Sequence, residues 1–220
     1  MGRFAPVVLI PAFQEAATIG AVVAEAVKYA PVVVGDDQSG DATVAIARDA
    51  GAEVRVHPAR LGYSASLNAL FEFALDQGWT HAVTMDADGE HDPRLLPLFL
   101  SALERVPLVL GRRPRTQRIA EAITAFYVRR RYGVHDIFCG MKGYALDLAR
   151  EAGGFDHMQS VGTDLALYAL RARRAFEEIA VSGTPRIDRP RFGSAWRANR
   201  QLLGVLRRIV ACDLKAPRKR

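Results

Sequence analysis

Hydrophobic and polar positions follow two different periods in the first half of the chain. Short runs of β-branched and other apolar residues, each ending in polar or turn residues, predict strands. These runs lie at residues 6–11, 31–37, 52–58 and 81–88. Between them, apolar residues recur at steps of three and four, which predicts helices over residues 15–30, 41–51 and 63–78. Strands that alternate with helices predict an α/β fold, a mostly parallel sheet with helices on both faces.

The second half of the chain is less regular. Its pattern predicts helices over 93–106 and 163–175, strands over 108–113 and 176–183, and an arginine-rich amphipathic segment over 116–132. We see no repeat and no linker that would divide the chain. We therefore expect one domain over residues 1–200, followed by a basic amphipathic helix and tail over residues 201–220.

Composition narrows the class of protein. Half of the 220 residues are hydrophobic, as in a globular domain. No run approaches the roughly 20 apolar residues that span a bilayer, and the N-terminus has no secretory signal, so we expect a cytoplasmic location. The net charge of +6 favours an acidic partner. The arginine clusters mostly lack interleaved aromatic residues, so we do not expect nucleic acid to be that partner.

Polar clusters follow three of the predicted strands. They are PAFQE after the first strand, DDQSGD after the second and DADGEHD after the fourth. Ligands of open parallel sheets bind beyond the carboxyl ends of the strands. The sequence therefore predicts that these three segments converge on one ligand site.

The third cluster has the composition of a metal site. Alternate side chains of an extended segment share a face, so Asp86 and Asp88 would point the same way and repel each other. A hard cation with oxygen ligands, Mg²⁺ or Mn²⁺, would relieve that repulsion and leave positions open for phosphates. The alternative is a turn capped by aspartates. In the second cluster Asp37, with Asp36 second, is a candidate for ligand binding.

Four segments in a fixed order resemble the motifs of a known family. They are VVLIPAFQEAATI, VVVGDDQSGDAT, RLGYSASLNAL and VTMDADGEHDP. Together they are similar to the family 2 glycosyltransferases, closely over residues 6 to about 114 and more loosely over 135–195. Two later segments, DIFCGMKGY and PRFGS, look most like the branch of dolichol- or polyprenol-phosphate sugar synthases.

The resemblance implies a fold and a reaction. The fold would be of the GT-A type, a Rossmann-like and mostly parallel sheet. The reaction would be a metal-dependent, inverting transfer from a nucleotide-diphosphate sugar, a UDP- or GDP-sugar, using Mg²⁺ or Mn²⁺. The acceptor would be a polyprenyl phosphate, another lipid or a small hydroxylated molecule.

The resemblance also implies roles for residues at the strand ends. The pocket for the base and ribose would be lined by Pro11, Ala12, Phe13 and Glu15. Asp37 would contact the base, and Gly62 would let the chain pass close to it. Asp86 would lie near the ribose and metal, while Asp88 would hold the ion that bridges the diphosphate. The usual Asn before Gly62 is absent from RLGYSAS.

Further roles fall in the second half. Arg112 or Arg113 would lie near the sugar or phosphate, and Asp136 with Cys139 and Gly140 would lie beside the acceptor. A loop that closes over phosphates would supply Arg186 or Arg189, with Arg191 and Ser194. We expect catalysis to depend on Asp88, Arg113 and Asp164.

Asp164 has two interpretations. A phosphate acceptor is already an anion, whereas a hydroxyl acceptor needs a carboxylate to take its proton, and Asp164 is the candidate. Asp164 also begins a predicted helix, where Thr163 and Asp164 would serve as capping residues. Two other functions stay open, sugar nucleotidyl transfer and a non-catalytic module that binds nucleotide sugars. The first would require a glycine-rich, basic loop that PAFQEAAT does not offer.

The C-terminal segment carries an apolar stripe flanked by arginines. The stripe consists of Leu202, Leu203, Leu206, Ile209 and Val210. Such a helix either packs on its own domain or lies on an anionic membrane surface. The second alternative predicts a location on the cytoplasmic face of a membrane and binding to anionic vesicles that salt abolishes.

Overall fold

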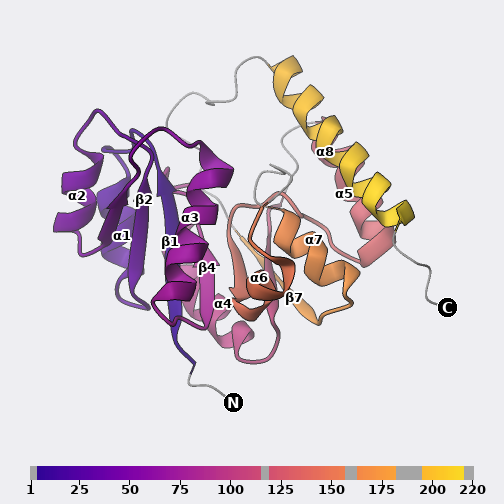
Figure 1. The fold of residues 1–220 in the computed structure, drawn as a ribbon, viewed down its shortest axis with the longest axis horizontal. Coiled ribbons are helices and arrows are strands. Elements are labelled where there is room, and N and C mark those ends of the chain that lie inside the picture. Colours follow the sequence, from indigo (N-terminus) through magenta and orange to yellow (C-terminus); the bar gives the residue numbers. More distant parts are fainter. Residues whose placement is uncertain (1–3, 115–118, 157–162, 182–194, 216–220) are drawn as a thin grey trace.

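A seven-stranded mixed sheet organises the computed structural model, which describes residues 4–114, 119–156, 163–181 and 195–215 (Figure 1). The strand order is β3-β2-β1-β4-β6-β5-β7. The strands are β1 (Pro6–Ala12), β2 (Val32–Asp36), β3 (Glu53–Val56), β4 (His81–Thr84), β5 (Leu108–Arg112), β6 (Lys142–Ala145) and β7 (Phe176–Ala180). The prediction of an α/β fold with a mostly parallel sheet is confirmed, since only β6 runs against its neighbours.

The parallel half of the sheet follows directly from the apolar runs. β1 pairs with β2 and β4, and β2 pairs with β3, all in parallel. Residues Val7 to Ile10 of β1 are completely buried, because helices cover both faces of this central strand. The strand predicted over residues 81–88 is shorter, because β4 ends at Thr84. Asp86 and Asp88 lie beyond it, and Asp88 is part of a turn with Gly89 at φ +79°, so the extended backbone assumed for this pair is not present.

β6 is an element that the sequence pattern did not reveal. Its four residues pair antiparallel with both β4 and β5. Two of them are glycine and lysine, so the segment lacks the apolar signal of the other strands. Gly143 in the middle allows close packing of α4, since a Cβ there would lie 3.0 Å from the Leu103 side chain. Because β6 is antiparallel, its first residue lies at the edge of the sheet where the other strands end.

Helices cover the sheet in two layers (Figure 1). The helices are α1 (Ile19–Ala26), α2 (Thr43–Asp49), α3 (Tyr63–Asp76), the 3₁₀ turn η1 (Pro93–Leu95), α4 (Leu96–Leu103), α5 (Ile119–Tyr132), α6 (Asp147–Ala152), α7 (Asp164–Arg171) and α8 (Ala195–Lys215). α1, α2 and α4 pack on one face of the sheet, where their apolar residues join Val8 and Ile10 of β1. α3, α6 and α7 pack on the other face with Val7 and Leu9. Alternate residues of β1 therefore belong to two separate cores, one on each face of the sheet.

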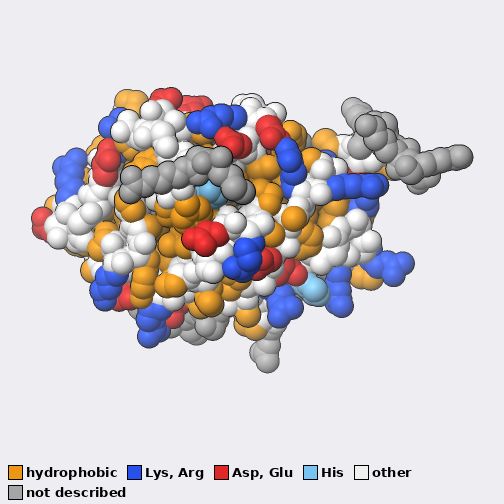
Figure 2. Space-filling view, turned by 90° about the horizontal axis from the view of Figure 1, so that it is seen from below, with side chains coloured by type: hydrophobic (Ala, Val, Ile, Leu, Met, Phe, Trp, Pro, Cys, Tyr) orange, Lys and Arg blue, Asp and Glu red, His pale blue; other side chains and the backbone are white. Residues whose placement is uncertain are grey.

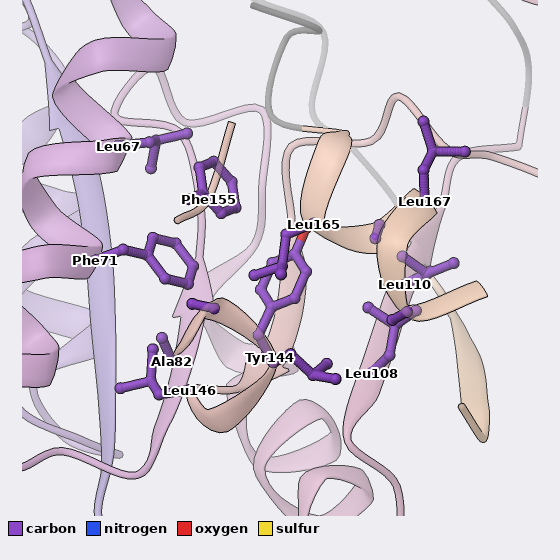
Figure 3. Packing of buried hydrophobic residues seen from close by; sticks show 14 of the residues in the cluster. Leu67, Phe71, Ala82, Leu108, Leu110, Tyr144, Leu146, Phe155, Leu165 and Leu167 are labelled. Atoms are coloured by element: carbon purple, nitrogen blue, oxygen red, sulfur yellow. The ribbon is translucent and has the colours of Figure 1, made fainter. Parts of the chain in front are cut away.

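Three aromatic rings form the centre of the second core (Figure 3). Phe71 of α3 stacks on Phe155 with ring centroids 4.2 Å apart, and Tyr144 of β6 meets both rings edge to face. Such pairs contribute about 0.5–1.5 kcal/mol each beyond burial alone. These contacts fix the antiparallel strand against α3, and so against the parallel half of the sheet.

α8 packs beside α5 at one end of the molecule (Figure 1). Leu202, Val205 and Ile209 are buried, whereas Leu203 is exposed, so the predicted stripe is divided between core and solvent. Asp213 fixes the helix, because its carboxylate accepts hydrogen bonds from the Tyr127 and Tyr132 hydroxyls and from Arg171. Among the described residues, no helix has both the length and the apolar character needed to cross a bilayer.

Candidate active site

One edge of the sheet collects the polar segments of the sequence. β1, β2, β3, β4, β5 and β7 all end there, and the antiparallel β6 begins there. Figure 2 shows the molecule from the side on which β1 begins, where acidic and basic side chains are interspersed. The candidate site is at the edge opposite to this view, as the rule for parallel sheets predicts.

The loop after β1 is held by side chains from the loop after β2. The Gln14 N–H donates to Ser39 Oγ at 2.8 Å, and the Glu15 N–H donates to Thr43 Oγ1 at 2.8 Å. Gln14 has φ +54°, a conformation that non-glycine residues rarely adopt. These bonds stabilise the turn after Phe13 and fix the position of Glu15, whose side chain is buried.

Asp37 joins the ends of β2 and β3. Its two carboxylate oxygens accept the N–H groups of Leu61 and Gly62, at 2.5 and 2.9 Å. Gly62 has φ +82°, which explains the glycine at that position. The Arg60 guanidinium lies 3.9 Å from the centre of the Phe13 ring and 4.0 Å from Asp37. Arg60 occupies the position of the missing Asn, so residues from three strand ends are in contact.

Asp36, the last residue of β2, is almost fully buried beside this contact. Its Oδ2 accepts the Ser39 N–H at 3.0 Å. Its Oδ1 has no hydrogen-bond partner among the residues that the structure describes. A buried carboxylate oxygen without a donor is costly, and it leaves an acceptor next to the predicted nucleotide pocket.

Asp86 is held from three sides. The Tyr63 hydroxyl donates to Oδ1 at 3.0 Å, and His91 Nδ1 lies 3.6 Å from Oδ2. Gly140, just before β6, leaves the space that the carboxylate occupies, since a Cβ there would lie 2.5 Å from Oδ2. Segments far apart in sequence therefore orient this single side chain.

His91 lies against Asp86 and is buried. Burial opposes its protonation, but the Asp86 carboxylate, the Cys139 thiol and the Asp88 carboxylate together outweigh burial and raise the pKa of His91 to about 9. The Asp86 N–H, however, donates to His91 Nδ1 at 3.0 Å, and this bond requires the neutral ring. A cation beside the carboxylates would favour that neutral form.

The donor set suits a hard divalent cation. Asp86 and Asp88 provide carboxylate oxygens, and the turn containing Asp88 is closed by the Glu90 N–H, which donates to Asp88 Oδ1 at 3.0 Å. Within the described ranges, no group of three or more His, Cys, Asp or Glu side chains is arranged to hold an ion by itself. Mg²⁺ commonly takes one or two protein carboxylates and completes its shell with water and substrate phosphates. The residues present therefore fit such an ion.

Arg113 forms an internal ion pair instead of facing outward. Its guanidinium binds Asp136 in a two-point contact at 2.7 and 3.1 Å, and it lies 3.6 Å from Glu121 of α5. Asp136 also accepts the N–H groups of Phe138 and Cys139. Burial acts to raise the pKa of Asp136, but Arg113 and these bonds outweigh burial and lower it. Arg113 thus holds the segment that leads into Gly140.

The other predicted residues are at the same edge or outside the described ranges. Pro11 and Ala12 end β1, and Arg112 ends β5 with an exposed side chain. Asp164 is the first residue of α7, where a carboxylate interacts favourably with the helix dipole. Three predicted residues, Arg186, Arg189 and Ser194, lie outside the described residues, as does Arg191.

Three contacts could not be read from the motifs. Tyr63 and His91 orient Asp86, and Glu121 pairs with Arg113. His91 is adjacent to the acidic cluster, and that proximity was the available signal. Tyr63 and Glu121 lie on helices and meet the site only through folding, so no local pattern marks them.

Comparison with known proteins agrees with this geometry. Residues 7–145 match the family model described as glycosyl transferase family 2. The undecaprenyl-phosphate mannosyltransferase of Micrococcus luteus is 28% identical over 179 residues, covering 72% of this chain and 73% of the relative. The polyprenol monophosphomannose synthase of Mycolicibacterium smegmatis is 29% identical over 161 residues, covering 62% of this chain and 60% of the relative.

A solved structure shares the fold at lower identity. It is glucosyl-3-phosphoglycerate synthase from Mycobacterium tuberculosis in complex with Mn²⁺, UDP and glucosyl-3-phosphoglycerate. The TM-score is 0.72 at 20% identity, covering 94% of this chain and 80% of the other. The likeness confirms the predicted GT-A type of fold.

Proposed function

This chain belongs to glycosyl transferase family 2 and is an inverting glycosyltransferase, and from that premise we propose that it moves a sugar from a nucleoside diphosphate to the phosphate of a polyprenyl phosphate. Two of its relatives are named for transfer to, or synthesis of, polyprenol phosphates. The observation that carries the proposal is the pair of carboxylates, Asp86 and Asp88, at the edge where the loops after β1, β2 and β3 also meet. This pair distinguishes a nucleotide-sugar enzyme from a module that only binds the base.

The nucleotide would bind along the ends of β1, β2 and β3. Pro11, Ala12, Phe13 and Glu15 would line the pocket for the base and ribose, as the family motifs imply. The mutual contacts of Phe13, Asp37 and Arg60 support this, because they already order the loops before a ligand arrives. A UDP- or GDP-sugar is the expected donor class.

Asp86 and Asp88 would hold Mg²⁺ or Mn²⁺ at the diphosphate. When bound, such an ion neutralises negative charge on the leaving diphosphate. The chain's own contribution is orientation: Tyr63 and His91 fix Asp86, and the Glu90 N–H fixes the turn at Asp88. A site held this firmly needs little rearrangement during the reaction.

The acceptor decides whether a base is needed. A phosphate acceptor attacks the sugar carbon as an anion, from the side opposite the leaving diphosphate, which inverts the configuration. No side chain then has to remove a proton, so Asp164 would act only at the helix terminus. Arg112, with Arg186 or Arg189 and Ser194, would bind the phosphates, whereas Arg113 would keep its internal position.

The acceptor also suggests a location. Polyprenyl phosphates reside in membranes, so the enzyme would work as a peripheral protein on the cytoplasmic face of a membrane. The net charge of +6 supports attraction to an anionic surface.

The test combines donor binding with product analysis. Thermal unfolding is measured with UDP, GDP and other nucleoside diphosphates, each with and without Mn²⁺. We expect one diphosphate to stabilise the protein, and only with the ion. A panel of nucleotide sugars is then offered with a detergent-solubilised polyprenyl phosphate or with hydroxylated acceptors. A sugar linked to the lipid phosphate is the expected product.

The same panel contains the opposing outcomes. Products formed only on hydroxyl acceptors would contradict the lipid-phosphate proposal. In that case Asp164→Asn should remove activity, whereas it should leave transfer to a phosphate intact. Stabilisation by nucleotide sugars without any product would contradict the reaction itself.

A further inference from the structure

The outward face of α5 is apolar where a surface helix is normally polar. Ile123 is 47% exposed and Phe126 is 69% exposed, and their spacing of three residues puts both on one face. The inward face of the same helix buries Ala120, Thr124 and Val128. α5 therefore has a second apolar surface that nothing in the described chain covers.

Arginines continue this face toward the end of the helix. Arg129 and Arg130 are exposed and, together with Phe126, line a hollow on the surface. Arg130 follows Phe126 by four residues, so the aromatic ring and the guanidinium lie one turn apart. The face thus changes from apolar to strongly basic within two turns.

The neighbouring α8 repeats this combination. Its inward residues Val205 and Ile209 are fully buried, while Leu203 and Leu214 are exposed, the latter by 78%. Arg207 and Arg208 are exposed between them. Seven large hydrophobic residues are exposed in the described chain, and four of them lie on α5 and α8. The apolar residues are therefore concentrated on one pair of helices.

We propose that the outward residues of α5 and α8 form a docking surface for an anionic lipid bilayer. Phe126 and Ile123 would enter the boundary between headgroups and acyl chains, and the arginines would bind the anionic headgroups. A second copy of this chain fits the surface poorly, because the arginines of one copy would face those of the other. The proposal rests on the proposed function in one respect: an acceptor embedded in the membrane requires the enzyme to bind there.

The surface is connected to the site through the first turn of α5. Glu121 is buried there and lies 3.6 Å from Arg113, the residue after β5. Arg113 in turn holds Asp136, which leads to Gly140 beside Asp86. A bilayer in contact with α5 would therefore lie near the edge where the acceptor phosphate must enter.

The test measures binding of the full chain to vesicles by flotation. Phosphatidylcholine vesicles are compared with vesicles that also contain phosphatidylglycerol, at low and high salt. We expect binding only to the anionic vesicles, and loss of that binding at high salt. Phe126→Ser should weaken it about tenfold. The double variant Arg129→Gln/Arg130→Gln should weaken it about 25-fold, since one arginine near an anionic surface contributes about fivefold.

The matched control is Leu98→Ser on α4. Leu98 is 55% exposed but lies on the helix layer that covers the other face of the sheet, so its loss should leave vesicle binding unchanged. Equal binding by wild type, Phe126→Ser and Arg129→Gln/Arg130→Gln would overturn the proposal. Sedimentation analysis gives a second opposing outcome. If wild type self-associated and Phe126→Ser did not, the surface would join two copies of the chain, and the proposal would be wrong.

Two transfer assays separate this proposal from the proposed function. With detergent-solubilised polyprenyl phosphate, the docking variants should transfer sugar as wild type does. With the acceptor embedded in anionic vesicles, their rates should fall in parallel with binding. Absence of transfer in both assays by a wild type that binds vesicles would contradict the function while leaving the docking surface intact.

Discussion

The two halves of the sheet position the site by different means. In the parallel half, the loops after β1, β2 and β3 are joined by neutral hydroxyls and backbone N–H groups, and by Asp37 with its two N–H donors. In the half that contains β5, β6 and β7, the segment before β6 depends on the ion pair of Arg113 with Asp136 and Glu121. The side chains of these two acids are at least 92% buried, because their exposures are 8% and 4%.

In the parallel half the stability is spread over several weak contacts, whereas in the other half it depends on a few buried charges. A neutral hydrogen bond contributes about 0.5–1.5 kcal/mol, and a loop with several of them tolerates the loss of one. Removing one member of a buried ion pair costs about 3–5 kcal/mol, because a charge is left without its partner. Substitutions at the parallel edge should therefore alter function more than stability, and substitutions around Arg113 should do the reverse.

Asp88→Asn should have the largest effect on function. The amide keeps the size of the side chain but loses the charge that would hold the ion. Turnover should fall about 10²–10³-fold, the scale for removing a group that stabilises transition-state charge. Stabilisation of the protein by a nucleoside diphosphate with Mn²⁺ should disappear, while the melting temperature without ligand should change little. Rate assays and thermal unfolding check both expectations.

Asp92→Asn is the control for that variant. Asp92 belongs to the same acidic cluster, but it caps η1 and pairs with Arg94 on the surface. Asparagine is an equally good cap, so activity should be retained. Equal losses in the two variants would mean that the acidic cluster acts only through its total charge.

Asp136→Asn should have the largest effect on stability. The largely buried Arg113 would keep Glu121 but lose its two-point partner, at a cost of about 3–5 kcal/mol in the free energy of unfolding. Asp147→Asn is the matched control, because Asp147 also pairs with an arginine but is 79% exposed. That control should cost less than about 1 kcal/mol. Urea unfolding of the three proteins measures the difference.

The same contrast explains why the parallel half is easier to predict from the sequence than the half that contains β5, β6 and β7. The loops of the parallel half hydrogen-bond through Ser39, Asp41 and Thr43, which are close together in the sequence and belong to one motif. The strands before them are continuous apolar runs. Their positions, and the convergence of the aspartates on one edge, could therefore be predicted.

The other half could not be predicted in the same way. β6 contains Lys142 and Gly143, and its antiparallel pairing depends on β4 and β5, which lie far away in the sequence. Arg112 or Arg113 was expected to lie near the sugar or phosphate, yet the Arg113 guanidinium pairs with residues 8 and 23 positions later. Charge pairing over such distances has no periodic signal, so only the folded chain reveals it.

Asp213→Asn tests whether a second buried carboxylate, outside the Arg113 ion pair, also stabilises this half of the molecule. Burial acts to raise the pKa of Asp213, but hydrogen bonds from Tyr132, Arg171 and Tyr127 outweigh burial and lower it. Losing the charge should cost about 1.5–3 kcal/mol in the free energy of unfolding at neutral pH. A pKa below that of the unfolded chain means that the contribution is complete above about pH 4 and is lost as pH falls through the folded value.

The measurement is urea unfolding of wild type and Asp213→Asn between neutral and acidic pH. The gap between the two proteins should stay constant down to about pH 4 and close below it. A gap that stays open in acid would show that the asparagine disturbs packing of α8 and not its charge contacts.

Thr43→Val tests the parallel half directly and should lower stability less than Asp136→Asn does. Valine keeps the shape of threonine but leaves the buried Glu15 N–H without its acceptor, at a cost of about 1–3 kcal/mol. Ser39→Ala removes the neighbouring bond to the Gln14 N–H, which is exposed to water, and should cost about 0.5 kcal/mol.

Both variants should weaken nucleotide binding by more than they lower stability, because the loop they release carries Phe13 and Glu15. Calorimetric titration with the nucleoside diphosphate, beside urea unfolding, compares the two effects. If Thr43→Val destabilised the chain as much as Asp136→Asn does, the parallel edge would depend on one buried contact too, and the two halves would not differ in the way their hydrogen bonds indicate.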